Sequence, residues 1–141
     1  MNVAISPKAM DSESAPYRLL GGSDKVRALV ETFYDVMSER EPVLARLHPC
    51  TLDGKVERGP RDRFALFLIG WLGGPDDYVA QHGHPRLRMR HNRVAVDTTM
   101  RDAWLRCMQA ALDTHAITGP LREFLDKRFA EVADFMRNVE G

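Results

Sequence analysis

The sequence predicts an all-α fold. Apolar residues recur at spacings of three and four along most of the chain, and the one run with two-residue alternation, residues 93–96, is short and weak. With 141 residues, of which 44% are hydrophobic and 28% charged, the chain is long enough for one domain with its own core. Two cysteines are too few for a disulfide scaffold, and the formal net charge of +0 excludes the overall basic excess of a nucleic-acid-binding protein.

The first long helix is expected to follow a flexible N-terminal arm. Residues 1–14, with several Ser, Pro and Lys, predict that arm, and residues 15–20 predict a short helix that two glycines end. Ser23 is then expected to be the N-cap of a helix that ends near Arg40. Its buried stripe is formed by Val26, Leu29, Val30, Phe33 and Met37.

A second group of elements follows before the middle of the chain. One or two helical turns are expected over residues 42–47, and Asp-Gly and Gly-Pro pairs predict a loop over residues 50–60. The next helix is expected over residues 61–72, where Gly73-Gly74-Pro75 ends it. Its inward face carries Phe64, Phe67, Leu68 and Trp71.

Two further helices are expected after an irregular segment at residues 76–92. Asp97 or Thr98 is predicted to cap the first of them, and Thr118-Gly119-Pro120 opens the second. The apolar face of the first includes Met100, Ala103, Trp104, Cys107, Met108 and Ala111, and that of the second includes Leu121, Phe124, Leu125, Phe129, Val132, Phe135 and Met136. Cys107 is therefore expected to be an inert buried thiol.

Three of the five histidines, His82, His84 and His91, fall within ten positions. No cysteine stands near them and no His-Glu-x-x-His arrangement is present, which disfavours a structural zinc site. His91 ends the run RLRMRH, and an imidazole beside several guanidinium groups suits a cofactor with a metal and two carboxylates, as haem has. A solvated basic segment with a surface histidine is the alternative that the spacing alone favours.

Aromatic residues provide a second indication of a haem pocket. Phe33, Phe64, Phe67 and Trp104 lie on faces predicted to point inward, and Tyr34 adjoins Phe33. Aromatic stripes are more often ordinary core. That interpretation leaves the Tyr34 hydroxyl and the Trp104 indole N–H in need of acceptors, which a ligand on iron could supply.

Two longer motifs resemble the truncated haemoglobins of group II. Gly83-His84-Pro85-Arg86-Leu87-Arg88-Met89-Arg90-His91 is followed after nine residues by Arg101-Asp102-Ala103-Trp104-Leu105-Arg106-Cys107-Met108. Phe33-Tyr34 and Gly73-Gly74-Pro75 also match that family in order and approximate spacing. The likeness covers about residues 15–137. It implies a truncated globin-like two-over-two helical sandwich that encloses one haem b, formed by residues 15–141.

The resemblance also implies roles for individual residues. His91 takes the place of the proximal iron ligand, and Tyr34 and Trp104 take the places of the two distal donors. His48 stands at the end of the third helix, where it would be a third polar group near the ligand. Eight residues are expected to contact haem: Arg63, Phe64, Phe67, Leu68, Tyr78, Leu87, Arg90 and Trp104. Among them, Arg63, Tyr78 and Arg90 are the candidates for binding the propionates.

The distal side departs from the family pattern in two respects. The loop at residues 50–60 is about four residues longer than in relatives with short connections, so the register through the loop is open. If the Gly-Gly-Pro sequence anchors the alignment, Pro60 and Phe64 face the iron. Neither side chain can donate a hydrogen bond to a ligand.

The resemblance implies a haem protein that binds dioxygen at ferrous iron and exchanges it slowly, because preorganised donors in a dry pocket stabilise charge on the oxygen. The alternative is a redox enzyme on the same haem, with nitric oxide dioxygenase or peroxidase-like activity, in which His48 is the candidate base. A helical interaction module without a cofactor is a third possibility that the haem motifs disfavour.

The expected partners are dioxygen and other diatomic ligands, together with an unidentified reductase, and no nucleic acid or membrane. The oligomeric state, monomer or dimer, stays open. The first twenty residues lack a signal-peptide pattern, and the longest apolar run, residues 64–74, is shorter than the roughly 18 residues that span a bilayer. A cytoplasmic location is therefore expected.

Overall fold

The structure is a computed structural model that describes residues 15–78 and 97–136. Its named helices are α1 (Pro16–Leu20), α2 (Ser23–Arg40), α3 (Pro42–Ala45), α4 (Arg58–Trp71), α7 (Thr98–Thr114) and α8 (Gly119–Met136). The described residues form no strand, and their one β-bridge joins Cys50 to Val56. The all-α class is confirmed.

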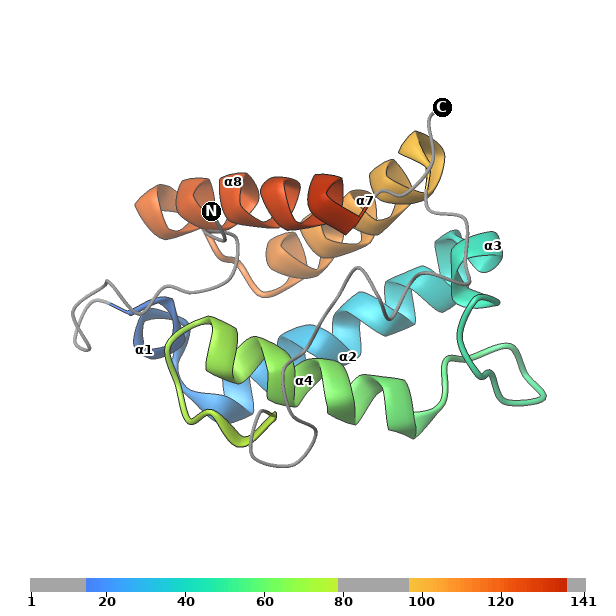
Figure 1. The fold of residues 1–141 in the computed structure, drawn as a ribbon, viewed down its shortest axis with the longest axis horizontal. Coiled ribbons are helices and arrows are strands. Elements are labelled where there is room, and N and C mark those ends of the chain that lie inside the picture. Colours follow the sequence, from blue (N-terminus) through green and yellow to red (C-terminus); the bar gives the residue numbers. More distant parts are fainter. Residues whose placement is uncertain (1–14, 79–96, 137–141) are drawn as a thin grey trace.

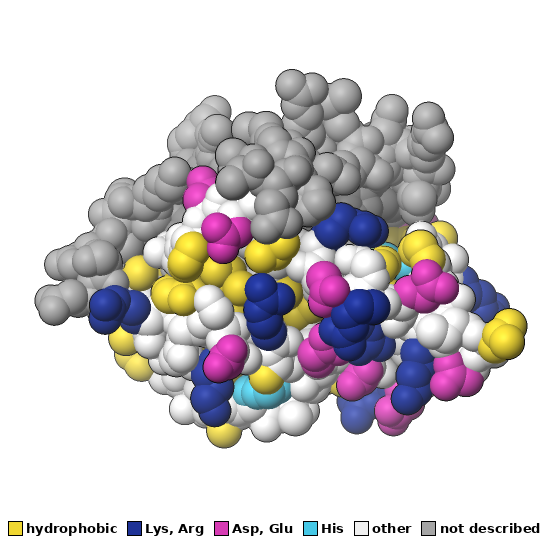
Figure 2. Space-filling model, turned by 90° about the horizontal axis from the view of Figure 1, so that it is seen from below, with side chains coloured by type: hydrophobic (Ala, Val, Ile, Leu, Met, Phe, Trp, Pro, Cys, Tyr) yellow, Lys and Arg dark blue, Asp and Glu magenta, His cyan; other side chains and the backbone are white. Residues whose placement is uncertain are grey.

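The four long helices form two layers of two. Figure 1 shows α7 and α8 in one layer and α2 and α4 in the other, with α1 and α3 at opposite ends of α2. Helix α2 packs against both α4 and α7, so it connects the two layers. None of the helices described is long and apolar enough to span a bilayer. On the face shown in Figure 2, basic and acidic side chains are interspersed, in keeping with the balanced formal charge.

Helix α2 begins differently from the prediction. Gly22, with φ 91°, occupies the N-cap and no side chain caps the helix, so the prediction that Ser23 is the N-cap is wrong. Ser23 is the first helical residue, and its hydroxyl pairs with the Tyr17 hydroxyl at 2.8 Å. The end of the helix at Arg40 is confirmed.

Helix α4 begins at Arg58, three residues before its predicted start. Pro60 lies in the first turn, where a missing N–H breaks no intrahelical hydrogen bond, so the Gly-Pro pair does not exclude a helix. The helix ends at Trp71, two residues before Gly73, which has a φ of 102°. A Cβ on Gly74 would lie 2.5 Å from the Tyr17 ring, so this glycine lets α1 pack against the chain beyond α4.

Helix α7 is capped by Asp97, one of the two residues predicted for this role. The Asp97 carboxylate accepts a 2.9 Å hydrogen bond from the backbone N–H of Met100, and Thr98 is the first helical residue. At the other end of the helix, His115 Nε2 lies 2.8 Å from the Thr32 hydroxyl. That hydroxyl donates to the carbonyl of Ala28, so it accepts its hydrogen bond from His115. This contact ties α7 to α2.

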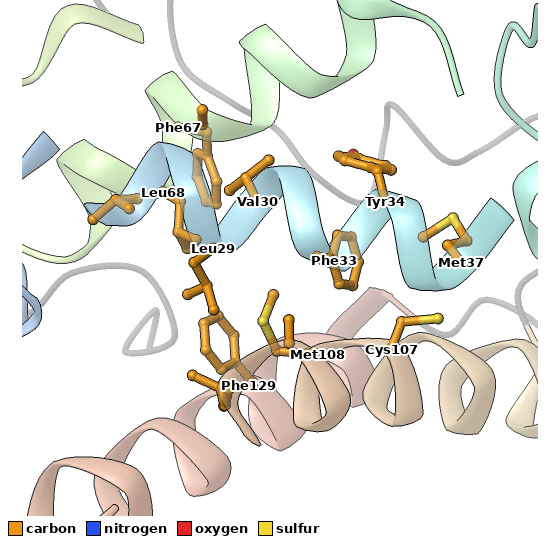
Figure 3. Packing of buried hydrophobic residues seen from close by; sticks show 14 of the residues in the cluster. Leu29, Val30, Phe33, Tyr34, Met37, Phe67, Leu68, Cys107, Met108 and Phe129 are labelled. Carbon is orange, nitrogen blue, oxygen red and sulfur yellow. The ribbon is translucent and has the colours of Figure 1, made fainter. Parts of the chain in front are cut away.

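The core between the layers contains the apolar stripe predicted for α2, and all five of its members are buried. Figure 3 shows Leu29 and Phe33 on the side of α2 that faces Met108, Cys107 and Phe129, while Tyr34 points to the opposite side. Cys107 is fully buried, as predicted, and Cys50 is half-buried. Helix α2 therefore presents an apolar face to α7 and the Tyr34 side chain to the opposite side.

Candidate functional site

Six aromatic side chains contact one another at α2 and are here called the aromatic cluster: Phe33, Tyr34, Phe64, Phe67, Tyr78 and Trp104. The Phe33 ring is central, with centroids 4.9 Å from Tyr34, 5.5 Å from Phe64 and 5.3 Å from Trp104. Phe64 continues the chain of contacts to Phe67 at 6.3 Å, and Phe67 reaches Tyr78 at 5.8 Å. These separations are typical of attractive edge and offset packing between aromatic rings. The structure thus brings together residues of α2, α4 and α7 that the sequence analysis predicted to lie near haem.

Adjacent positions on α2 deliver two different side chains to the cluster. Neighbouring residues of a helix point about 100° apart, so Phe33 faces α7 while Tyr34 faces α4. Only 6% of Tyr34 is exposed. Burial raises the pKa of the Tyr34 hydroxyl, and the nearby positive charges of Arg63 and Arg61 oppose this increase in part. The hydroxyl therefore stays protonated near neutral pH and is available as a hydrogen-bond donor.

Two polar groups in the aromatic cluster have no hydrogen-bond partner among the described residues: the Tyr34 hydroxyl and the Trp104 indole N–H. In the same part of the chain, every fully enclosed side-chain nitrogen or oxygen has a partner. The two donors must therefore border accessible space rather than solid protein. Their rings are tied together through Phe33, which contacts both. The arrangement offers two donors to a small, electron-rich ligand.

His48 lies just beyond α3, with its ring centroid 5.7 Å from that of Tyr34. Its Nδ1 lies 3.2 Å from the carbonyl oxygen of Leu44 and 3.3 Å from that of Ala45. Since carbonyl oxygens only accept, Nδ1 carries the hydrogen, and in the neutral ring Nε2 carries a lone pair. Neutral His48 is then an acceptor at Nε2, whereas the protonated ring can donate from both nitrogens.

The residues predicted to face the iron lie on α4. Pro60 is buried in the first turn, and the half-buried Phe64 belongs to the aromatic cluster. Leu68 is buried in the core at 1% exposure. Arg63 is exposed, and among the described residues no carboxylate pairs with its guanidinium, which leaves it able to bind an anionic group. Tyr78 is buried against Phe67.

Arg61 is the residue that the sequence analysis missed. It is only 5% exposed, and its guanidinium pairs with Glu31 at 2.9 Å and Asp35 at 2.8 Å. Its Nε donates to the carbonyl of Val56 at 2.8 Å. A pattern in the sequence could have indicated this burial, because Arg61 precedes Phe64 by three positions and so lies on the same face of α4.

The remaining predicted site residues, Leu87, Arg90 and His91, lie outside the described residues, as do His82 and His84. The role of His91 as an iron ligand stays a prediction. Across residues 15–78 and 97–136, no group of three or more His, Cys, Asp or Glu side chains could hold a metal ion.

The described side chains fit a planar apolar prosthetic group. Such a group requires flat apolar surfaces, which the rings of Phe64, Phe67 and Trp104 provide. Its acidic substituents require a cation without a partner, and Arg63 meets that requirement. A ligand on its metal requires donors in a nearly dry environment, which Tyr34 supplies.

Comparisons with known proteins agree with this assignment. A family model described as bacterial-like globin matches residues 15–138. The chain is 36% identical over 127 residues to the group 2 truncated haemoglobin YjbI of Bacillus subtilis, an alignment that covers 90% of this chain and 91% of that protein.

Solved structures show the same similarity in three dimensions. A cold-adapted truncated haemoglobin from the Antarctic marine bacterium Pseudoalteromonas haloplanktis superposes with a TM-score of 0.81 at 41% identity, covering 89% of this chain and 99% of that one. A truncated oxygen-avid haemoglobin from Bacillus subtilis superposes with a TM-score of 0.79 at 36% identity, covering 89% of this chain and 100% of that one.

Proposed function

This chain belongs to the bacterial-like globin family, as a group II truncated haemoglobin, and we propose that it binds dioxygen reversibly and releases it slowly. Membership of the family implies a haem cofactor and the binding of diatomic gases. The observation that carries the finer proposal is the pair of donors in the aromatic cluster, Tyr34 and Trp104, which have no partner among the described residues.

Haem b, the proposed form of the cofactor, supplies an open coordination position on iron for a diatomic ligand. In this proposal His91 would hold the iron, and Arg63, Tyr78 and Arg90 would hold the propionates. Phe64, Phe67, Leu68 and Leu87 would supply the apolar contacts.

Tyr34 is proposed to be the principal donor to the ligand. Its hydroxyl is protonated near neutral pH, burial raises its pKa further above the ordinary value, and its position is fixed by the rings of Phe33 and Phe64. A hydrogen bond to a partly charged acceptor contributes about 1.5–3 kcal/mol, and a surrounding of low dielectric strengthens it. Such a donor slows the departure of a ligand that accumulates negative charge.

Trp104 is proposed to be the second donor, from the opposite layer. Its ring packs between Phe33 at 5.3 Å and Phe129 at 5.9 Å, which restricts the directions available to the indole N–H. Donors held in place before binding cost little reorganisation when the ligand arrives. The similarity to a truncated haemoglobin from Bacillus subtilis that is oxygen-avid supports slow release here as well.

The test is the rate of oxygen release from the ferrous protein, measured by rapid mixing. Tyr34→Phe is expected to speed release about tenfold or more, and Trp104→Phe to speed it in the same direction, because each removes one charge-assisted hydrogen bond. Tyr17→Phe is the matched control, since it removes a tyrosine hydroxyl that pairs with Ser23 instead. Unchanged release in both Tyr34→Phe and Trp104→Phe would contradict the proposal.

The second candidate function is a redox activity, either nitric oxide oxidation or peroxide reduction. One observation favours it: the carbonyls of Leu44 and Ala45 hold the Nδ1 hydrogen of His48, so Nε2 of the neutral ring can accept a proton. A base in this position could take a proton from a peroxide substrate. Turnover would also require an unidentified reductase. A separate measurement, the pH–rate profile of peroxide reduction, tests this point, because His48→Phe should remove one ionisation from that profile.

A further inference from the structure

A single charged side chain, Arg61, is buried in the part of the chain that the structure describes. Three acceptors fix its guanidinium: the Val56 carbonyl at 2.8 Å, the Glu31 carboxylate at 2.9 Å and the Asp35 carboxylate at 2.8 Å. A buried charge is costly unless it is paired and hydrogen-bonded, and these three contacts satisfy that requirement. The position of the cation is therefore closely defined.

That position is over the Tyr34 ring. The guanidinium carbon of Arg61 lies 5.9 Å from the centroid of the ring, within the range of a cation–π interaction. Glu31 and Asp35 lie one turn apart on α2, on either side of Tyr34 in the sequence, and both pair with the Arg61 guanidinium. A positive charge over the ring draws electron density away from the phenol oxygen, and the hydroxyl becomes a stronger donor.

The two carboxylates do not cancel this field at the ring. The side chains of Glu31 and Asp35 are 36% and 58% exposed, whereas that of Arg61 is 6% exposed. Water therefore screens the negative charges much more than the positive one. Arg63 adds a second positive charge to the surroundings of the Tyr34 hydroxyl.

We propose that Arg61 is a positioning residue, which holds Tyr34 in place and strengthens its hydroxyl as a hydrogen-bond donor to the ligand. This inference rests on the proposed role of Tyr34 in ligand binding. It assigns to α4 an electrostatic function that acts through a side chain of α2 and not by contact with the ligand.

Arg58 provides a matched control within the same ion-pair network. It also pairs with Glu31, and its second partner, Asp62, lies 3.3 Å away. Its side chain is 63% exposed, so its charge is screened by solvent. Arg58→Gln therefore changes the net charge by the same amount as Arg61→Gln at a position away from the Tyr34 ring.

The experiment compares the ferrous haem-loaded protein with Arg61→Gln, Arg61→Lys and Arg58→Gln, each with Tyr34 present and with Tyr34→Phe. The readouts are the oxygen release rate and the infrared C–O stretching frequency of the carbon monoxide complex, which reports the electric field at the ligand. With Tyr34 present, Arg61→Gln should speed oxygen release about two- to tenfold and raise the stretching frequency. Arg61→Lys should restore part of both effects, and Arg58→Gln should leave both unchanged.

The Tyr34→Phe background distinguishes an electrostatic role from a structural one. If Arg61 acts through the hydroxyl, Arg61→Gln has no further effect once that hydroxyl is gone. An effect of equal size in both backgrounds would overturn this inference and leave the proposed function standing. If Tyr34→Phe alone changes nothing, the proposed role of Tyr34 as a donor fails, and this inference fails with it. Should Arg61→Gln not fold, Arg61→Met repeats the comparison with an uncharged side chain of similar length.

Discussion

On one side of α2, Leu29, Phe33 and Met37 pack into an apolar layer, whereas on the other side Tyr34 and Ser38 lie near hydroxyl, carboxylate and imidazole groups. The Ser38 hydroxyl accepts a hydrogen bond from the N–H of Val56 at 3.1 Å, on the same side as Arg61. The apolar side depends on the exclusion of water, and the polar side depends on the placement of donors and charges. Tyr34, the principal proposed donor, thus lies on the polar side of α2, while Trp104 reaches the same cluster from the opposite layer through Phe33.

The largest expected effect is a loss of stability from a substitution on the apolar side of α2. Leu29 is 2% exposed, and Leu29→Ala should lower the free energy of unfolding by about 2–5 kcal/mol, because the lost side chain leaves a cavity in a packed layer. Urea denaturation measures this change. Leu19→Ala, at a side chain that is 56% exposed, is the control and should change stability little. An equal loss of stability in the two variants would show that the two positions do not differ in packing.

A smaller effect on the same side depends on pH. Burial raises the pKa of the Cys107 thiol from its ordinary value of 9.0 to about 12. The unfolded chain therefore loses this proton first, and ionisation favours unfolding as the pH rises from about 9 towards 12. Stability should fall in this range by up to about 1.4 kcal/mol per pH unit.

Other groups titrate in the same range, so the measurement is a comparison of the wild-type protein with Cys107→Ala. The slope of the unfolding free energy against pH should be less steep in the variant. Parallel slopes would show that Cys107 is not held in an apolar environment in the folded protein.

The smallest expected effect concerns the polar side. The hydrogen bond from Arg58, together with that from Arg61, holds the pKa of Glu31 below its ordinary value of 4.5. This contribution is present near neutral pH and is lost as the pH falls below about 4.5. Because Glu31 is about one-third exposed, Glu31→Gln should lower stability by only about 0–1 kcal/mol at neutral pH. Urea denaturation at pH 7 and pH 3 checks both statements, and a large loss at pH 7 would contradict them.

The parts of the fold that follow local patterns were predictable from the sequence. The buried stripe of α2 repeats with helical period, and Asp97 has a side chain suited to capping, so both predictions are confirmed. Ser23 has the same capping ability. Its hydroxyl is paired with Tyr17 of another helix, and that contact is not visible in the local sequence.

The candidate site was predictable in its residue types but not in its electrostatics. Resemblance to a family selected Tyr34 and Trp104, while the proximity of the two side chains depends on how α2 packs against α7. The burial of Arg61 depends on two carboxylates contributed by a different helix. An arginine on an apolar face is a local signal, but the acceptors that allow its burial become evident only from the tertiary structure.

The central place of α2 has a consequence for the dynamics of the protein. This helix packs against α1, α3, α4 and α7, so its middle turns cannot detach without disrupting both layers. Amide hydrogens in these turns should exchange with deuterium only through global unfolding, as the slowest set in the chain. Openings that admit a small molecule must therefore arise in other segments, while α2 stays folded through each cycle of ligand entry and escape.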